Sequence, residues 1–312
     1  MPTNTTRHRK KQHRRKHTRK FKRMNCNPGT SGKTSVADSC LTDDVLVQLK
    51  TSFNESHPDK RILSTDSKSI WRDLKKKLKS CDKEDCWLDT ITDPLVRRKL
   101  DKQSFAPDHP TSWNKDPDEW LSNFDIADVL KQYEETYKNF VFLGPSPIDF
   151  DTRLPENGGD CVWEELCKFQ VKNYLESGKT KIGIVFNLDH HGQGGSHWVS
   201  MFVDLEDQYM FFMDSAGDKI PHEIDALAKR IIAQGLDLET PMHIHFHENC
   251  PMEHQYGNNE CGMYSLYFIV TMLTNKTEKK VFKNYADKIA FFKNKRIPDK
   301  YMNHYRKKYF NS

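Results

Sequence analysis

Four residues in the C-terminal half of the chain have the types and the order of a thiol-based catalytic centre. Asp214 follows His197 by seventeen residues, and Cys261 comes last. A cysteine attacks through its thiolate, which a nearby imidazolium and the unpaired N–H groups of a helix N-terminus both favour. A carboxylate holds such an imidazole ring in orientation and stabilises its charged form. We therefore expect Cys261 to be the nucleophile, with His197 as the base and Asp214 as the orienting acid.

Gln255, six residues before Cys261, is the fourth member of this group. Its side-chain amide and the backbone N–H of Cys261 would form an oxyanion hole, in which a single donor is worth roughly 10² to 10³ in rate. Asp204 is a rival for the orienting acid because it belongs to the same predicted hairpin. Because Asp204 is expected in mid-strand or at the turn, Asp214 is the favoured candidate for the acid that orients His197.

Short strands and one buried helix are the elements that must bring these residues together. Runs of β-branched and aromatic residues, and one alternating run, predict strands in the second half of the chain. The continuously apolar run 261–273 begins with small residues and is about thirteen residues long, so we expect a buried helix that opens at Cys261. The strands are expected at 181–188, 197–205, 209–215 and 242–248.

Helical periodicity dominates the chain before these strands. Apolar residues recur at helical spacing between residues 41 and 100, from Ser122 to Tyr137, and from Cys161 to Ser177. A Pro-rich stretch at 105–120 has the composition of loops and turns and indicates a domain boundary. We therefore expect a disordered basic tail and linker in 1–37, a helical N-terminal region in 38–104, and the domain with the candidate centre in 105–312.

The formal net charge of +5 is the average of two unlike pieces. Residues 1–23 hold eleven Lys or Arg and no carboxylate, which leaves the remaining body at −6. This distribution excludes a uniformly basic nucleic-acid-binding fold. The tail, with Arg14, Arg15 and Lys16 at its centre, can neutralise phosphates without reading a base sequence. The same composition also suits a nuclear-localisation signal or a solvated tail without a partner.

Cysteine and histidine usage raises two further questions. The eight cysteines are too sparse for a disulfide scaffold, so we expect a reducing compartment and mostly free thiols. A rival zinc site lies in the alternating run, because His243, His245 and His247 share a strand face and Cys250 follows. Their spacing matches no common zinc finger, and same-face strand residues lie roughly 7 Å apart. We therefore expect no metal.

The residues of the candidate centre also carry a family resemblance. The string GGSHWVSMFVDLEDQYMFFMDSAG, followed by QYGNNECGMYSLYF, resembles the ubiquitin-like-protein-specific and adenovirus-type cysteine proteases, in the chain order His, Asp, Gln, Cys. Upstream, WLSNFDI, FVFLGPSPIDFD and KIGIVFNLDHHGQGGSHW look more like the polyprotein-processing members of large DNA viruses, such as African swine fever virus, than like cellular deconjugases. The resemblance spans about residues 105 to 275.

The resemblance implies an α+β, papain-like core with a rearranged chain order, in which a mixed sheet packs against a buried helix that starts at the catalytic cysteine. It implies peptide-bond hydrolysis through an acyl-enzyme and needs no cofactor. Relatives cleave after Gly-Gly because a narrow channel admits only glycine beside the scissile bond. Trp198 would form one wall of that channel, and Trp120, Ser122 and Asn123 are candidates for contacting the substrate strand.

The sequence thus predicts a cysteine endopeptidase that matures viral polyproteins at Gly-Gly sites during virion assembly. A deconjugase of ubiquitin-like modifiers and a catalytically inactive, nucleic-acid-binding virion protein stay open as alternatives. The expected partners are a polyprotein or modifier-fusion substrate, and nucleic acid through the tail. No apolar run approaches the ~18 residues of a membrane span, so no membrane partner is expected. The virion and the host cytoplasm at the assembly site are the expected locations, with the nucleus as the alternative.

Overall fold

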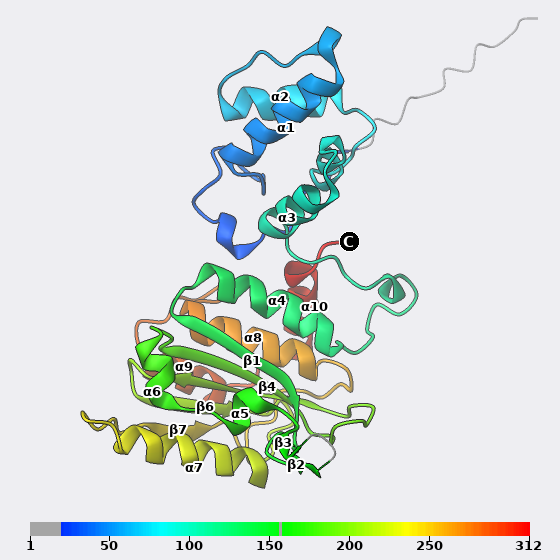
Figure 1. The fold of residues 1–312 in the computed structure, drawn as a ribbon. Coiled ribbons are helices and arrows are strands. Elements are labelled where there is room, and N and C mark those ends of the chain that lie inside the picture. The colour runs from blue at the N-terminus through cyan, green and yellow to red at the C-terminus, as the bar shows by residue number, and fades with distance from the viewer. Residues whose placement is uncertain (1–19, 156–157) are drawn as a thin grey trace, which may run out of the picture.

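A mixed five-stranded sheet lies at the centre of the computed structural model, which describes residues 20–155 and 158–312 (Figure 1). Its strand order is β1-β4-β5-β6-β7. The three central strands β4, β5 and β6 are antiparallel neighbours, while β1 pairs parallel with β4 and β7 pairs parallel with β6. The strands are β1 (Phe140–Pro147), β4 (Lys181–Asn187), β5 (Trp198–Asp204), β6 (Tyr209–Met213) and β7 (His245–Glu248), with a separate β2 (Arg153–Leu154) and β3 (Asp160–Cys161) hairpin.

The central strand β5 divides the hydrophobic core into two layers. All of its residues are buried, and successive side chains point to opposite faces of the sheet. Trp198 and Phe202 belong to one hydrophobic cluster, whereas Val199 and Met201 belong to another. Helices cover both faces. One face carries α4 (Asn123–Thr136), α8 (Cys261–Thr274), α9 (Tyr285–Asn294) and α10 (Asp299–Tyr309), and the other carries α5 (Glu164–Cys167), α6 (Val171–Glu176) and α7 (His222–Leu236).

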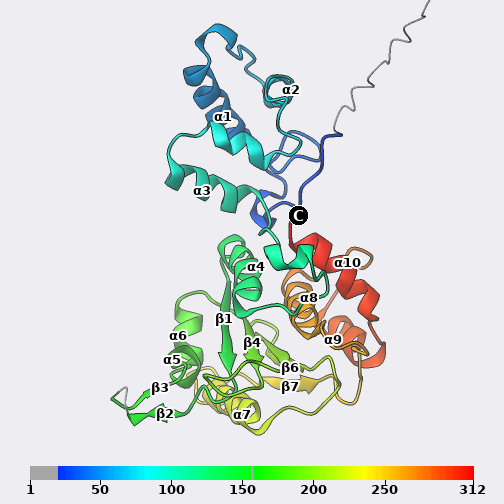
Figure 2. The ribbon, with the colours of Figure 1, turned by 90° about the vertical axis from the view of Figure 1, so that its right-hand side faces the viewer.

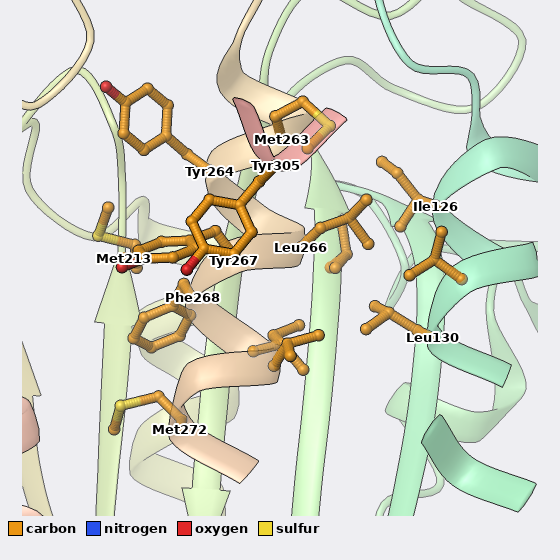
Figure 3. Close-up of a cluster of buried hydrophobic side chains, with 14 of the residues drawn as sticks. Ile126, Leu130, Met213, Met263, Tyr264, Leu266, Tyr267, Phe268, Met272 and Tyr305 are labelled. Carbon is orange, nitrogen blue, oxygen red and sulfur yellow. The ribbon is translucent and has the colours of Figure 1, made fainter. Parts of the chain in front are cut away.

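Helix α8 is the buried helix that the apolar run predicts. It begins at Cys261, and every residue from there to Leu273 is buried. Figure 3 shows α8 in front of the sheet strands, with Leu266 directed towards Ile126 and Leu130 of α4. A helix that is apolar on all sides must be enclosed in this way, because none of its faces gains by meeting water. The expected mixed sheet packed against a buried helix is therefore confirmed.

The prediction of one continuous helix from Cys161 to Ser177 is wrong. The structure has the short helices α5 and α6, separated by residues 168–170. Gln234 of α7 binds the chain at this break, because its side-chain oxygen accepts from the Val171 N–H and its amide donates to the Phe169 carbonyl, each at 2.9 Å. Phe169 is buried there. Tertiary contacts thus replace the intrahelical bonds that a continuous helix would make.

The N-terminal region is helical and has its own hydrophobic cluster. Figures 1 and 2 show it beyond α4, away from the sheet. Buried residues from Met24 to Phe105 form the cluster, and Phe21 packs against Trp71 and Trp87. The region consists of α1 (Asp43–Ser56), α2 (Ser67–Lys77) and α3 (Pro94–Ser104), with 3-10 turns η1 (Pro28–Thr30), η2 (Pro58–Lys60) and η3 (Asp85–Thr90); η4 (Thr111–Asn114) follows α3.

The structure differs from the disordered linker expected up to residue 37. Asn25 binds the C-terminal segment through its backbone N–H, which donates to the Asn311 side chain at 2.7 Å, and through its own side chain, which donates to the Phe310 carbonyl. Cys26 forms a β-bridge with Phe105. Polar side chains in this glycine-containing stretch therefore have tertiary partners, which composition alone does not reveal. The tail residues Arg14, Arg15 and Lys16 lie outside the described residues.

The expectation of mostly free thiols is also not met. Six cysteines are paired in disulfides, and Cys250 and Cys261 are the free ones. The pairs are close in sequence, five to fourteen residues apart, so local folding is enough to bring them together. In the described ranges, no helix is long and apolar enough to cross a membrane. The disulfides are Cys26–Cys40, Cys81–Cys86 and Cys161–Cys167.

The contact between the two chain ends gives a stability prediction. The buried Asn311 side chain accepts from the Asn25 N–H and donates to the carbonyls of Asn25 and Ala106. Asn311→Ala leaves these groups unpaired and is expected to lower the free energy of unfolding by about 1–3 kcal/mol. Urea unfolding measures the loss. Asn303→Ala, on the exposed side of α10, is the matched control and should change it by less than about 0.5 kcal/mol. Equal losses in the two variants would contradict this account.

Candidate active site

His197 and Asp214 meet at one end of the β5–β6 hairpin. The antiparallel register pairs Ser200 with Met213, so the residue just before β5 and the residue just after β6 lie at the same edge of the sheet. The His197 Nε2 and the Asp214 Oδ1 are 2.7 Å apart, which is a hydrogen bond. The Asp214 side chain is almost fully buried, and that of His197 is 22% exposed. The hairpin therefore forms the His–Asp pair that the sequence predicts.

A buried asparagine that the sequence reasoning missed holds Asp214 in place. The Asn249 side-chain oxygen accepts from the Asp214 N–H at 2.9 Å, and the Asn249 amide donates to the Asp214 carbonyl at 2.6 Å. The Ala216 N–H also donates to the Asp214 carboxylate. Asn249 directly follows β7, the parallel neighbour of β6, so the sheet brings it beside Asp214. No local pattern in the sequence marks this contact.

Asp204, the rival acid, lies at the opposite end of β5. Its carboxylate accepts from the Lys181 ammonium at 2.7 Å and from the backbone N–H groups of the turn that follows β5. It is fully buried and forms part of this ion pair. The geometry therefore assigns the contact with His197 to Asp214.

Cys261 supplies the thiol at the first residue of α8 and is 2% exposed. Burial by itself lowers the pKa of His197, but hydrogen bonds with Asp214 and Cys261, and the charges of both groups, outweigh burial and raise this pKa to about 10. Because Asp214 binds Nε2, the Nδ1 atom is the ring nitrogen left for the thiol. An imidazolium beside a thiol at a helix N-terminus is the arrangement that favours a thiolate at neutral pH.

Gln255 is anchored beside the same pair. Its side-chain oxygen accepts from the Ser215 hydroxyl at 2.7 Å, and its backbone N–H donates to the Ser215 carbonyl. The Gln255 amide donates one bond to the Gly257 carbonyl at 3.0 Å. A side-chain amide has two N–H donors, so a second one is left for a ligand. The placement is compatible with an oxyanion hole, and that role stays a prediction.

The candidate substrate residues line one cleft of about 620 Å³ beside Trp198. Trp120, Ser122 and Asn123 form part of its wall, and the Trp120 side chain is 42% exposed. The loop between β4 and β5, with His190 and His191, forms another part. The structure therefore brings together all of the residues that the sequence assigns to substrate contact.

Close packing joins this cleft to the start of α8. The Trp198 indole N–H donates to the Leu121 carbonyl at 2.9 Å, so the ring is held by the chain just before α4. A Cβ at Gly262 would lie 3.0 Å from the Leu121 Cβ, closer than side chains normally approach. The glycine after Cys261 therefore lets the helix start lie directly against the cleft wall.

The alternative zinc site has no counterpart in the part of the chain that the structure describes. Within 20–155 and 158–312, no group of three or more His, Cys, Asp or Glu side chains could hold a metal ion. His245 lies on the edge strand β7, with its side chain exposed, whereas His243 precedes that strand.

Comparison with known proteins agrees with this geometry. Residues 179–311 match the model of the Ulp1 protease family, C-terminal catalytic domain, and this range contains all four residues of the candidate centre. A candidate thiol protease of Acanthamoeba polyphaga mimivirus is 32% identical over 169 residues, which cover 53% of this chain and 52% of that protein. This chain thus spans about half the length of the mimivirus relative.

Proteins of African swine fever virus match over a longer stretch. One named a SUMO-1 cysteine protease is 27% identical over 232 residues, covering 67% of this chain and 81% of that protein. Another, named a cysteine protease, is 27% identical over 257 residues, which cover 76% of this chain and 82% of that protein. A crystal structure of this viral protease superposes with a TM-score of 0.61 at 22% identity, covering 93% of this chain and 97% of that one. The predicted fold is confirmed, and the match to the protease family covers residues 179–311.

The raised pKa of His197 predicts the reactivity of Cys261 with iodoacetamide. His197 keeps its proton below a pKa of about 10, and Cys261 lies at the N-terminus of α8, so alkylation of Cys261 at pH 7 should be fast. Cys250, also free, is the internal control and should be alkylated more slowly than Cys261 at pH 7. Mass spectrometry of peptides distinguishes the two sites.

Asp214→Asn tests the cause of this reactivity. It removes a charge that raises the pKa of His197, so the imidazolium loses its proton at lower pH and the thiolate is less favoured. We expect alkylation of Cys261 at pH 7 to slow by about tenfold or more, since one pKa unit is a factor of ten. An unchanged alkylation rate of Cys261 would contradict the role of Asp214 in this reactivity.

Proposed function

Because residues 179–311 carry a cysteine peptidase domain of the Ulp1 protease family, we propose that this chain is a viral cysteine endopeptidase that cuts protein substrates after Gly-Gly. Its substrates are structural polyprotein precursors, which it processes during particle assembly at a cytoplasmic site and inside the virion. One observation carries the proposal: His197 is hydrogen-bonded to the buried Asp214 at one edge of the sheet, and Cys261 opens the buried helix α8.

The proposed reaction proceeds through an acyl-enzyme. The Cys261 sulfur attacks the carbonyl carbon of the scissile bond, and the oxygen takes up the negative charge beside the Cys261 N–H and the Gln255 amide. His197 gives its proton to the leaving amine as the C–N bond breaks. It then accepts a proton from water, which attacks the thioester and releases the acid, so that thiolate and imidazolium are restored. Asp214 keeps the ring oriented through both steps.

The packing around Trp198 supports glycine beside the scissile bond. The indole is fixed by the Leu121 carbonyl and is 8% exposed, so this wall cannot easily move aside for a larger side chain. Trp120, on the neighbouring wall, exposes a second indole to the same cleft. An extended substrate that passes these rings fits best where it has no side chains.

A second candidate function is removal of ubiquitin-like modifiers. The observation that favours it is the name of a similar African swine fever virus protein, a SUMO-1 cysteine protease. The exposed Phe124, at the start of α4 beside the cleft wall, would be available to a folded modifier. The preference between a folded modifier fusion and a short peptide separates the two functions.

Cleavage of a short Gly-Gly-X peptide tests the nucleophile. Cys261→Ser should lower kcat by about 10⁴-fold or more, in line with the loss of a catalytic nucleophile in other proteases. Cys250→Ser is the matched control and should keep wild-type activity. Equal activity of Cys261→Ser and wild type would overturn the assignment. A fusion to a folded modifier that is cut much faster than the peptide would favour the deconjugase.

The basic tail gives a separate prediction. We propose that it tethers the protease to nucleic acid in the assembling particle, with a nuclear address as the alternative. Residues 1–19 hold eight Lys or Arg and no Asp or Glu. Deleting 1–19 should leave peptide cleavage intact while DNA binding weakens and loses much of its salt dependence. Fluorescence anisotropy at several salt concentrations measures binding, and lost peptide cleavage would contradict this division of roles.

A further inference from the structure

Segment 117–121 supplies Glu119, Trp120 and Leu121 to the cleft wall and is held by a buried arginine from the far end of the chain. Arg306, on α10, donates from Nη1 to the Pro117 carbonyl at 2.8 Å and from Nη2 to the Glu119 carbonyl at 2.6 Å. These contacts span almost 190 positions of sequence. The planar guanidinium thus binds two carbonyls of one segment at once, each from a different nitrogen in a fixed fork.

Arg306 is enclosed on its other sides as well. The residue is 7% exposed, and its guanidinium carbon lies 4.2 Å from the centre of the Trp113 ring, a cation–π contact. Burial lowers the pKa of this group, and the carboxylates of Asp118 and Glu260 act in the opposite direction. A buried charge is costly unless its donors are satisfied. Here Nη1 and Nη2 of Arg306 both donate to backbone carbonyls of segment 117–121.

Two further side chains bind the same wall, and both adjoin the catalytic residues in sequence. Asn259, two residues before Cys261, donates its amide to the Asp118 carbonyl. Trp198, directly after His197, donates to the Leu121 carbonyl at 2.9 Å. Side chains from α10, from the loop before α8 and from β5 therefore fix the wall relative to both reacting groups.

We propose that Arg306 is a positioning residue for substrate binding, which holds segment 117–121 so that Trp120 lines the cleft beside Trp198. The inference rests on the proposed function, because a substrate must occupy this cleft. Arg306 acts through the wall and not on the reacting atoms. Its loss should therefore weaken binding of the ground state and the transition state alike, which raises KM and leaves kcat nearly unchanged.

Steady-state cleavage of the Gly-Gly-X peptide by the full chain is the first measurement. Arg306→Met leaves both carbonyls without their donor, and we expect KM to rise about tenfold, a typical effect of losing charged hydrogen bonds. Arg306→Lys keeps the charge but loses the planar fork, so a smaller rise in KM is expected. This variant is used if the methionine variant does not fold. Lys307→Met is the matched control, since it removes an exposed charge from the next position and should leave KM unchanged.

Two readouts separate positioning from a purely structural role. The alkylation rate of Cys261 should match wild type in both Arg306 variants, because the His197–Asp214 pair is not touched. Hydrogen–deuterium exchange should accelerate in peptides that cover residues 113–123 and stay unchanged in those that cover α8. Neither readout needs peptide cleavage.

The outcomes distinguish this inference from the proposed function. A wild type that does not cleave the peptide overturns the proposed function, and hydrogen exchange still decides whether Arg306 holds the wall. Unchanged exchange at 113–123 in folded Arg306 variants overturns the proposal that Arg306 holds segment 117–121. Faster exchange with an unchanged KM overturns its part in substrate binding. A raised KM with normal kcat and normal alkylation supports it.

Discussion

The hydrogen bond between His197 and the buried Asp214 is the interaction on which the site depends. Burial alone would strip the imidazole of its proton, because low polarity disfavours the charged form. The carboxylate and the thiol reverse that effect and raise the pKa of His197 to about 10. Asp214 must itself be fixed in place, and Asn249 does this by binding both its N–H and its carbonyl.

The sheet and α8 meet this requirement with rigid elements. The β5–β6 register places histidine and aspartate at one edge, and the enclosed α8 presents Cys261 to them at its first turn. Since α8 is apolar on all sides, sliding or turning it would expose apolar surface or leave cavities. Gly262 completes the fit, because only a residue without a side chain allows Leu121 so close. The hydrophobic core thereby determines the geometry of a polar site.

A local sequence pattern predicts those elements whose formation depends on neighbouring residues. The apolar run after Cys261 and the strands around His197 and Asp214 are of this kind, so the sequence predicts the candidate centre. It does not predict some other elements. The edge strand β1 was not predicted; it contains Gly144 and Pro145, which are typical of turns, although an edge strand tolerates proline. Helix α7 is absent from the expectations, although its apolar residues carry a helical period. Contacts such as that of Asn249 link distant positions, which no window of sequence reveals.

The C-terminal helix joins features that are remote along the chain. Arg306 binds the cleft wall, and five positions later Asn311 binds Asn25 and Ala106 next to the helical N-terminal region. Both contacts lie at the C-terminal end of α10, because Arg306 is three residues before the end of the helix and Asn311 is two residues after it. The N-terminal region and the substrate wall are therefore attached to the same short segment of the chain. The position of the wall depends on this segment as well as on the sheet and α8, which carry the reacting groups.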